Sequence, residues 1–149
     1  MKKIFNLLIA TTFIVALSSC SKENKIEKNL WKKGGDWEIS KFYSYYGSFN
    51  PSVNGGMDPV PYTFNNCGSM HFGKDGNGTI TFAIDGTTDS YAFKYSNTEK
   101  EMTLIIDGEA RVYDLTWSKD VITIEYDNST TDPDGYPEVD NESFMLYKK

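Results

Sequence analysis

Few of the 149 residues could carry out catalysis, and His71 is the only histidine. A catalytic triad needs a nucleophile and an orienting acid in contact with the imidazole, and nothing in the sequence places them there. Catalytic zinc normally takes three protein ligands, often several histidines, which this chain cannot supply. We therefore predict that His71 lies at the surface or a rim. We expect no catalytic residue, no metal site and no cofactor, so the protein is not expected to be an enzyme.

The two cysteines, Cys20 and Cys67, are too few for a disulfide scaffold or a four-ligand zinc site. A nucleophilic thiol needs a neighbouring base or a positive field. His71 lies four residues beyond Cys67, which along a strand does not bring the two side chains together by default. We predict that Cys67 is a small buried hydrophobic residue. If Cys20 stays unmodified, a disulfide between the two cysteines is the alternative.

Two acidic segments are candidates for calcium. Residues 74–80 (KDGNGTI) are similar to the centre of an EF-hand loop, but the first and twelfth positions hold Gly73 and Ile84 in place of the required acids. We predict a hairpin turn there. The segment 127–142 fits no calcium loop and is predicted to be a solvated acidic loop, with calcium binding left open. A hydrolase that uses loop carboxylates is a disfavoured alternative. The six acidic residues of this segment are Asp127, Asp132, Asp134, Glu138, Asp140 and Glu142.

The N-terminal segment has the pattern of an export signal. Lys2 and Lys3 precede the mostly apolar stretch 4–17, which is too short to span a bilayer. The sequence Leu-Ser-Ser-Cys ending at Cys20 resembles the lipobox of bacterial lipoproteins, in which the cysteine is acylated and becomes the first residue. The resemblance implies that residues 1–19 are a signal peptide and that the protein is anchored in the cell envelope by lipid at Cys20. It implies the outer membrane, and whether the protein faces the periplasm or the cell surface is left open. Residues 20–29 are predicted to form a polar tether.

Overall composition limits the possible partners. The full chain carries 15 Lys and Arg against 21 Asp and Glu, and removing Lys2 and Lys3 leaves 13 basic residues, a net charge of −8. Phosphate backbones repel such a chain, so we expect no nucleic-acid partner.

Beyond residue 30, apolar residues recur at every second position, which is typical of half-buried strands. Asp-Gly turns at 85–86 and 107–108 and other short turns would pair successive strands antiparallel. Eight such strands can hide their apolar faces by closing into an up-and-down barrel, and an open β-sandwich is the alternative fold. The two longer connections, 47–66 and 128–142, are predicted to be irregular. The eight apolar sets are Trp37/Ile39/Tyr43/Tyr45, Met70/Phe72, Ile80/Phe82/Ile84, Tyr91/Phe93/Tyr95, Met102/Leu104/Ile106, Tyr113/Leu115/Trp117, Ile122/Ile124/Tyr126 and Phe144/Leu146.

Gly35-Asp36-Trp37 opens the first predicted strand, and a long loop and about seven further strands follow. This pattern resembles the lipocalin-like (calycin) barrels, and more narrowly the small lipocalin-like lipoproteins of Gram-negative bacteria, over residues 30–149. The resemblance implies that Trp37 plugs the closed end of the barrel and that the segment 47–66 covers the open end. The chain differs from full lipocalins at its last strand. Full lipocalins have an arginine there that stacks on the tryptophan, whereas this chain has Lys148 and Lys149. The only arginine is Arg111.

An eight-stranded barrel is either filled by its side chains or holds one small ligand, and the many large rings favour a mostly filled interior. Lys41 and Phe42 break the alternation of the first strand, which a bulge or a polar group in a cavity would explain. We expect the barrel to bind a small apolar, aromatic or sugar ligand. A protein-interaction or structural module is the alternative, with the partner unknown. The candidate ligand residues are Tyr43, Tyr45, Tyr91, Phe93, Tyr113 and Trp117.

Overall fold

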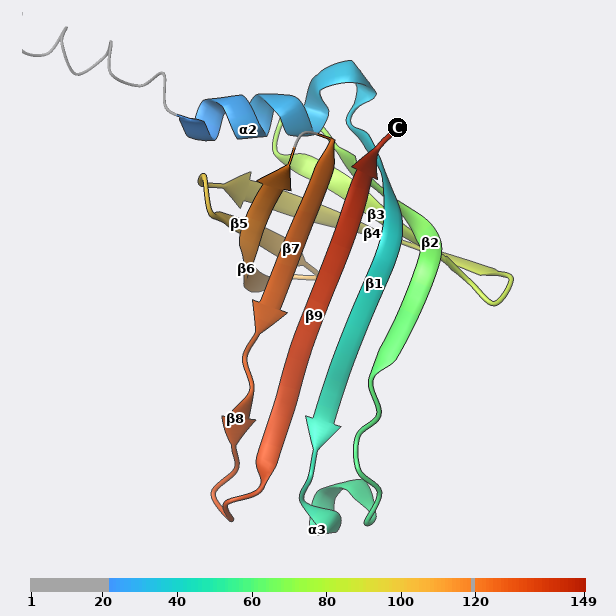
Figure 1. Cartoon of the computed structure of the whole chain (residues 1–149), viewed down its shortest axis with the longest axis vertical. Coiled ribbons are helices and arrows are strands. Elements are labelled where there is room, and N and C mark those ends of the chain that lie inside the picture. The colour runs from blue at the N-terminus through green and yellow to red at the C-terminus, as the bar shows by residue number, and fades with distance from the viewer. Residues whose placement is uncertain (1–21, 119) are drawn as a thin grey trace, which may run out of the picture.

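The structure is a computed structural model that describes residues 22–118 and 120–149, in which eight antiparallel strands close into a barrel (Figure 1). Each strand pairs with the next, and the last pairs with both β7 and β1, which closes the sheet and confirms the predicted barrel. The strands are β1 (Asp36–Ser48), β2 (Tyr62–Phe72), β3 (Asn77–Ile84), β4 (Thr87–Asn97), β5 (Glu101–Ile106), β6 (Glu109–Ser118), β7 (Val121–Asp127) and β9 (Pro137–Lys148).

The tight turns follow the chemistry of their residues. Asp85-Gly86 and Asp107-Gly108 both have positive φ at both positions, as the two-residue turns between twisted strands require. Between β2 and β3, Asp75 Oδ1 accepts a hydrogen bond from the backbone N–H of Asn77. The segment that is similar to an EF-hand is therefore a hairpin turn, as predicted.

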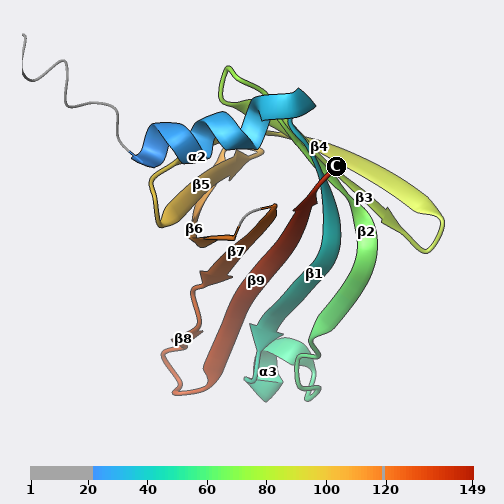
Figure 2. The same ribbon diagram turned by 45° about the horizontal axis from the view of Figure 1, so that its top comes forward.

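One end of the barrel is covered by helix α2 (Lys22–Trp31), whereas helix α3 (Pro51–Asn54) and the short strand β8 (Thr130–Thr131) lie at the far end (Figures 1 and 2). Ile26 and Leu30 of α2, four residues apart on one face, pack against the barrel core, and Leu30 is fully buried. A short 3₁₀ turn, η1 (Lys32–Gly34), joins α2 to β1. The predicted polar tether is therefore helical from residue 22, because two apolar side chains give the helix a surface to bury.

Trp37 is buried beneath α2, at the end of the barrel where the chain enters β1. Its indole N–H donates to the Leu30 carbonyl at 2.9 Å, and its ring meets that of Trp117 edge-on at 5.5 Å. The Nζ of Lys148, its neighbour across the β1–β9 pairing, lies 4.6 Å from the ring centroid. Lys148 thus lies over the buried indole, on the strand next to β1.

A bulge between Ile39 and Lys41 shifts the register of β1 against both neighbours. Phe42 beyond the bulge packs against the core, so the side chains at positions 43 and 45 turn outward. The predicted common face of Trp37, Ile39, Tyr43 and Tyr45 is wrong for this reason, and the bulge considered for Lys41 and Phe42 is confirmed.

The two connections predicted to be irregular contain regular structure. Strand β2 begins at Tyr62 and β9 at Pro137, and both extend alongside a long β1. No helix among the described residues is long and apolar enough to cross a membrane. The predicted signal peptide and Cys20 lie outside the described residues.

Candidate functional site

Two adjoining hollows open at the end of the barrel opposite α2, which we call the mouth. The first has a volume of about 380 Å³ and the second about 360 Å³, and Ile106, Asp107 and Glu142 line both. Their linings come from β1, β3, β4, β5, β6 and β9 and the β5–β6 turn, so six of the eight barrel strands converge on them. The segment 47–66, which the resemblance places over the open end, contributes no side chain to either lining.

The second hollow has an aromatic floor. Phe42 of β1 stacks on Phe144 of β9 with ring centroids 4.7 Å apart and lies 5.1 Å from Phe82 of β3. Phe42 and Phe82 are half-buried, so parts of their rings remain open to a ligand, while Phe144 joins the floor to the core. Ile80, Ile84 and Ile106 complete the apolar lining.

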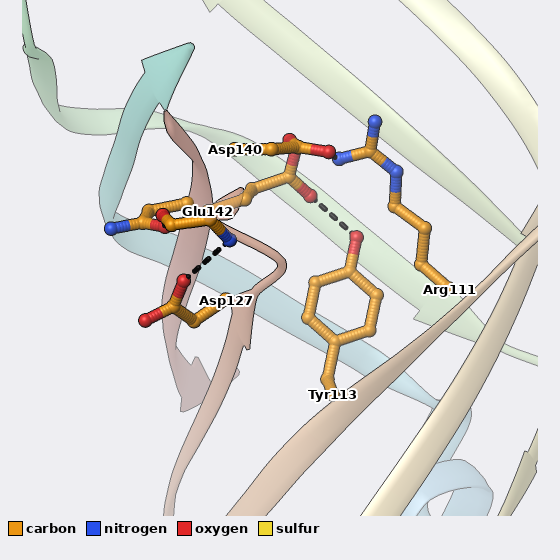
Figure 3. Close-up of polar contacts among 7 residues, drawn as sticks. Arg111, Tyr113, Asp127, Asp140 and Glu142 are labelled. Atoms are coloured by element: carbon orange, nitrogen blue, oxygen red, sulfur yellow. Dashed lines mark hydrogen bonds and ion pairs between the residues drawn. The ribbon is translucent and has the colours of Figure 1, made fainter. Parts of the chain in front are cut away.

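The first hollow holds a polar cluster around Arg111 on β6, and Figure 3 shows the side chains that lie beside this residue. The guanidinium lies 3.4 Å from Asp140 and 3.6 Å from Glu142, both on β9, and 4.9 Å from the ring of Tyr126. Tyr113 donates its hydroxyl hydrogen to Glu142 over 2.5 Å. Since these residues alternate along their strands, Arg111 and Tyr113 share the inward face of β6, and Asp140 and Glu142 share that of β9.

Burial shifts the acidity of this cluster. It raises the pKa of Glu142, although the Tyr113 hydroxyl and Arg111 both act to lower it. Burial and the neighbouring Glu142 carboxylate raise the pKa of Tyr113 above its usual value. Burial would lower the pKa of Arg111, but Asp140 and Glu142 together raise it. Arg111 therefore stays charged, and its charge is already matched by the two carboxylates on β9.

Further carboxylates line the mouth. Asp89 of β4 stands opposite Phe82 on the inward face, while Asp107 and Glu109 lie where the β5–β6 hairpin turns. Among the described residues none of these three is in an ion pair. The mouth thus combines an apolar floor with an excess of negative charge at its rim.

The structure brings only two of the six predicted ligand residues to the mouth. Tyr91 lines the apolar hollow and Tyr113 the polar one. Phe93 fills the core, and Trp117 packs against Trp37 beneath α2. Tyr43 and Tyr45 follow the bulge and face outward.

The other candidate chemical groups lie elsewhere. Cys67 is 2% exposed, which confirms its predicted burial, and burial raises the pKa of its thiol. His71 is half-exposed on the outer surface, where its Nδ1 lies 2.8 Å from Asp36. In the described part of the chain, no three His, Cys, Asp or Glu residues are grouped as metal ligands.

Sequence reasoning missed Arg111, Glu142 and the rings of Phe42, Phe82 and Phe144 as site residues. Glu142 was assigned to an irregular loop, although it shares the parity of Phe144 and Leu146. Arg111 shares the parity of Tyr113. The sequence therefore offered one signal for these two residues: a charged residue at the same alternate positions as inward apolar residues of its strand is expected to point inward too.

Comparisons of the chain with protein-family models, curated proteins and solved structures found no match. The barrel is compatible with the lipocalin-like resemblance, which rests on the sequence pattern and on this geometry.

Proposed function

We propose that the chain is a lipid-anchored protein of the cell envelope whose barrel binds, without chemistry, a small ligand with an apolar or aromatic body. The observation that carries this proposal is the pair of hollows at the mouth, with an aromatic floor beside a polar cluster. Apolar concave sites with a few converging polar groups are the usual form of small-molecule sites.

Charge at the mouth favours a ligand whose polar end is cationic or donates hydrogen bonds. Arg111 is engaged with Asp140 and Glu142, so it offers little to an anionic ligand. Asp89, Asp107 and Glu109 provide acceptors along the lining. An ammonium group would also be attracted to the faces of the floor rings.

A matched ligand series tests this proposal. Decyltrimethylammonium, decanol and decanoate share a chain and differ in the charge of the head, and binding is measured as an upward shift in melting temperature. We expect the largest shift with the cation, a smaller one with the alcohol and none with decanoate. Absence of a shift with all three would overturn the ligand-binding proposal.

A pair of neighbouring substitutions supplies the control. Ile106 lines both hollows, whereas Ile105 points to the outer surface and is 37% exposed. Ile106→Arg should abolish binding by filling the mouth and adding positive charge, while Ile105→Arg should leave binding unchanged. Equal effects of the two would show that the ligand binds outside the mouth.

The anchor is a separate part of the proposal, supported by the lipobox-like sequence that ends at Cys20. Several acyl chains, at about 0.8 kcal/mol for each buried CH₂, would hold the protein firmly to a membrane. Mass spectrometry of the mature protein should show an acylated N-terminal cysteine, and Cys20→Ser should release the protein from the membrane fraction. An unmodified mature chain would refute the anchor.

A protein-interaction module is the second candidate, because apolar side chains are exposed beyond the mouth. Val53, Met57, Val60 and Tyr62 are each at least 60% exposed in and after α3, and Tyr46 is 74% exposed nearby on β1. Exposed apolar groups gathered at one site often mark protein interfaces. Loss of partner capture on Val53→Ser with Met57→Ser, with mouth binding intact, would support this candidate.

A further inference from the structure

A third hollow lies at the end of the barrel covered by α2, and lysines dominate its lining. It has a volume of about 200 Å³, and its charged residues are Lys32, Lys33, Lys148 and Asp120. Three ammonium groups therefore face one carboxylate, the reverse of the balance at the mouth. The amide of Asn29 adds a polar group, and the indoles of Trp37 and Trp117 form its apolar part.

The backbone around this hollow is held in an unusual conformation. Lys33 has φ 60° and ψ 39°, a left-handed conformation that non-glycine residues seldom adopt and that carries a cost in free energy. Gly34 and Gly35 also have positive φ, and the three residues form the turn between α2 and β1; Lys32 and Lys33 both line the hollow beside this turn. Lys148 reaches the hollow from β9, which pairs with β1, and its Nζ donates to the Leu30 carbonyl at 3.2 Å.

The outward face of α2 extends the basic surface. Because Ile26 and Leu30 turn toward the barrel, helical geometry at about 100° per residue places Lys28 on the opposite side and Lys25 beside it. Both lysines are exposed. These two lysines and the three that line the hollow, Lys32, Lys33 and Lys148, are together called the basic surface, and they lie at the end of the barrel that α2 covers.

We infer that the basic surface docks on the headgroups of anionic phospholipids, with a lipid phosphate entering the lysine-lined hollow. Two observations select a membrane as the occupant. The charge is complementary to a phosphate-rich surface, and the chain that precedes α2 leads within two residues to the cysteine of the proposed anchor. The choice of membrane rests on that proposed anchor, whereas the phosphate chemistry rests on the hollow alone.

Anchoring would let weak contacts of this kind determine orientation. A tethered surface meets the membrane at a high effective concentration, so a modest attraction per lysine is enough. The barrel would stand with α2 against the headgroups and its acidic mouth directed away from the same anionic lipids. Ligands would then reach the mouth from the aqueous side.

Intrinsic fluorescence offers a direct readout, because all three tryptophans lie at this end of the barrel. Trp37 and Trp117 line the hollow, and Trp31 ends α2, with Lys74 5.5 Å from its ring. The mature chain is titrated with monomeric dihexanoylphosphatidylglycerol, with dihexanoylphosphatidylcholine and with inorganic phosphate. The acyl chains of the two lipids are identical, so only the headgroup differs. Because these probes are soluble, the measurement does not depend on acylation. Because the tryptophans lie at the end opposite the mouth, the emission reports on the hollow and not on the mouth.

We expect the emission to change with the glycerol lipid, little with the choline lipid, and only at higher concentration with phosphate. Lys32→Gln with Lys33→Asn should weaken binding by roughly tenfold or more, since each lysine contributes near an anionic surface. Asn tolerates the left-handed conformation of residue 33, and Lys32→Gln alone serves if the double variant is unstable. Lys41→Gln with Lys94→Asn removes the same charge from exposed positions on the barrel wall and should leave binding unchanged.

Three results would overturn the inference. These are no response to the glycerol lipid, an equal response to the choline lipid, or an equal loss in the wall variant. Inorganic phosphate binding as tightly as the glycerol lipid would establish a free-phosphate site and refute the membrane assignment. The mass spectrum tests the proposed anchor, and the decyl ligand series tests ligand binding at the mouth. Each of the three proposals can therefore be refuted without the other two.

Discussion

The two ends of the barrel each place a cation over an aromatic ring, in opposite surroundings. Beneath α2, Lys148 lies over Trp37, a ring that is almost fully buried, and lysines outnumber carboxylates in the adjoining hollow. At the mouth, Arg111 lies over the half-buried Tyr126, and carboxylates outnumber the single guanidinium. The cation therefore lies over a buried ring at the end beneath α2, and over a half-buried ring beside an open hollow at the mouth.

This difference separates stability from binding along the barrel axis. Large side chains near α2 pack together in the buried core, including Trp37, whose ring meets that of Trp117 edge-on. Near the mouth the inward positions become charged, and polar groups must satisfy one another before any ligand arrives. Substitutions near α2 should therefore act mainly on folding, and substitutions at the mouth mainly on charge balance and ligand affinity.

The largest expected effect is at the packed end. Trp37→Ala removes a fully buried ring, its hydrogen bond to Leu30 and the support of Lys148, so we expect a loss of about 3–5 kcal/mol in the free energy of unfolding. Urea denaturation measures the loss. Tyr91→Ala at the mouth, where the ring is 43% exposed, is the control and should cost much less. Equal losses would contradict the assignment of stability to the end beneath α2.

The sequence predicts the barrel well because strand alternation and Asp-Gly turns are local signals. Alternation reports which face of a strand is buried, and a two-residue turn forces its neighbours to pair antiparallel. The signal is lost where geometry is set by distant residues. The bulge of β1 reversed the faces of Tyr43 and Tyr45, and the shift in register against both β2 and β9 became visible only in three dimensions.

The mouth was less predictable because its residues come from strands far apart in the sequence. Arg111 and Glu142 are separated by 31 positions, and no short motif joins them. The acidic composition of 127–142 indicated a solvated loop, whereas the segment belongs to β9 from Pro137 onward, and β9 pairs with β1 and β7. Composition reports the average environment of a segment and does not reveal which charged side chain faces inward.

Arg111→Met should produce the second-largest effect. It leaves Asp140 and Glu142 partly buried beside each other without their cation, so we expect a loss of about 1–3 kcal/mol, less than for a fully buried pair. The loss is measured by urea denaturation and should shrink at acidic pH, where protonation relieves the repulsion.

Adding Glu142→Gln to Arg111→Met should restore part of the stability by removing one of the two charges. A loss that is independent of pH, with no rescue in the double variant, would show that Arg111 acts through packing alone.

At the mouth, Glu142 should make the free energy of unfolding depend on pH. Burial raises its pKa in the folded state above the ordinary carboxyl value of 4.5, so the folded chain binds this proton more tightly than the unfolded chain. The resulting stabilisation is complete below the unfolded pKa and is lost as pH rises through the folded pKa. Relative to Glu142→Gln, the wild-type protein should therefore lose stability as pH rises above about 4.5, measured by urea denaturation at several pH values. Stability that rises relative to the variant over that range would contradict the sign.

The smallest expected effect comes from the outer surface near the packed end. His71 and Asp36 form a close contact at 2.8 Å, yet both side chains are more than half exposed. Water screens such a pair and each side chain loses freedom in forming it, so His71→Ala should change the free energy of unfolding by about 0–1 kcal/mol. The measurement is urea denaturation at low and high salt at pH 6, with Lys149→Ala as a second exposed pair, since its Nζ lies 3.6 Å from Glu38. A loss comparable to that of Trp37→Ala would mean that surface charge, in addition to the buried rings, holds this end of the barrel together.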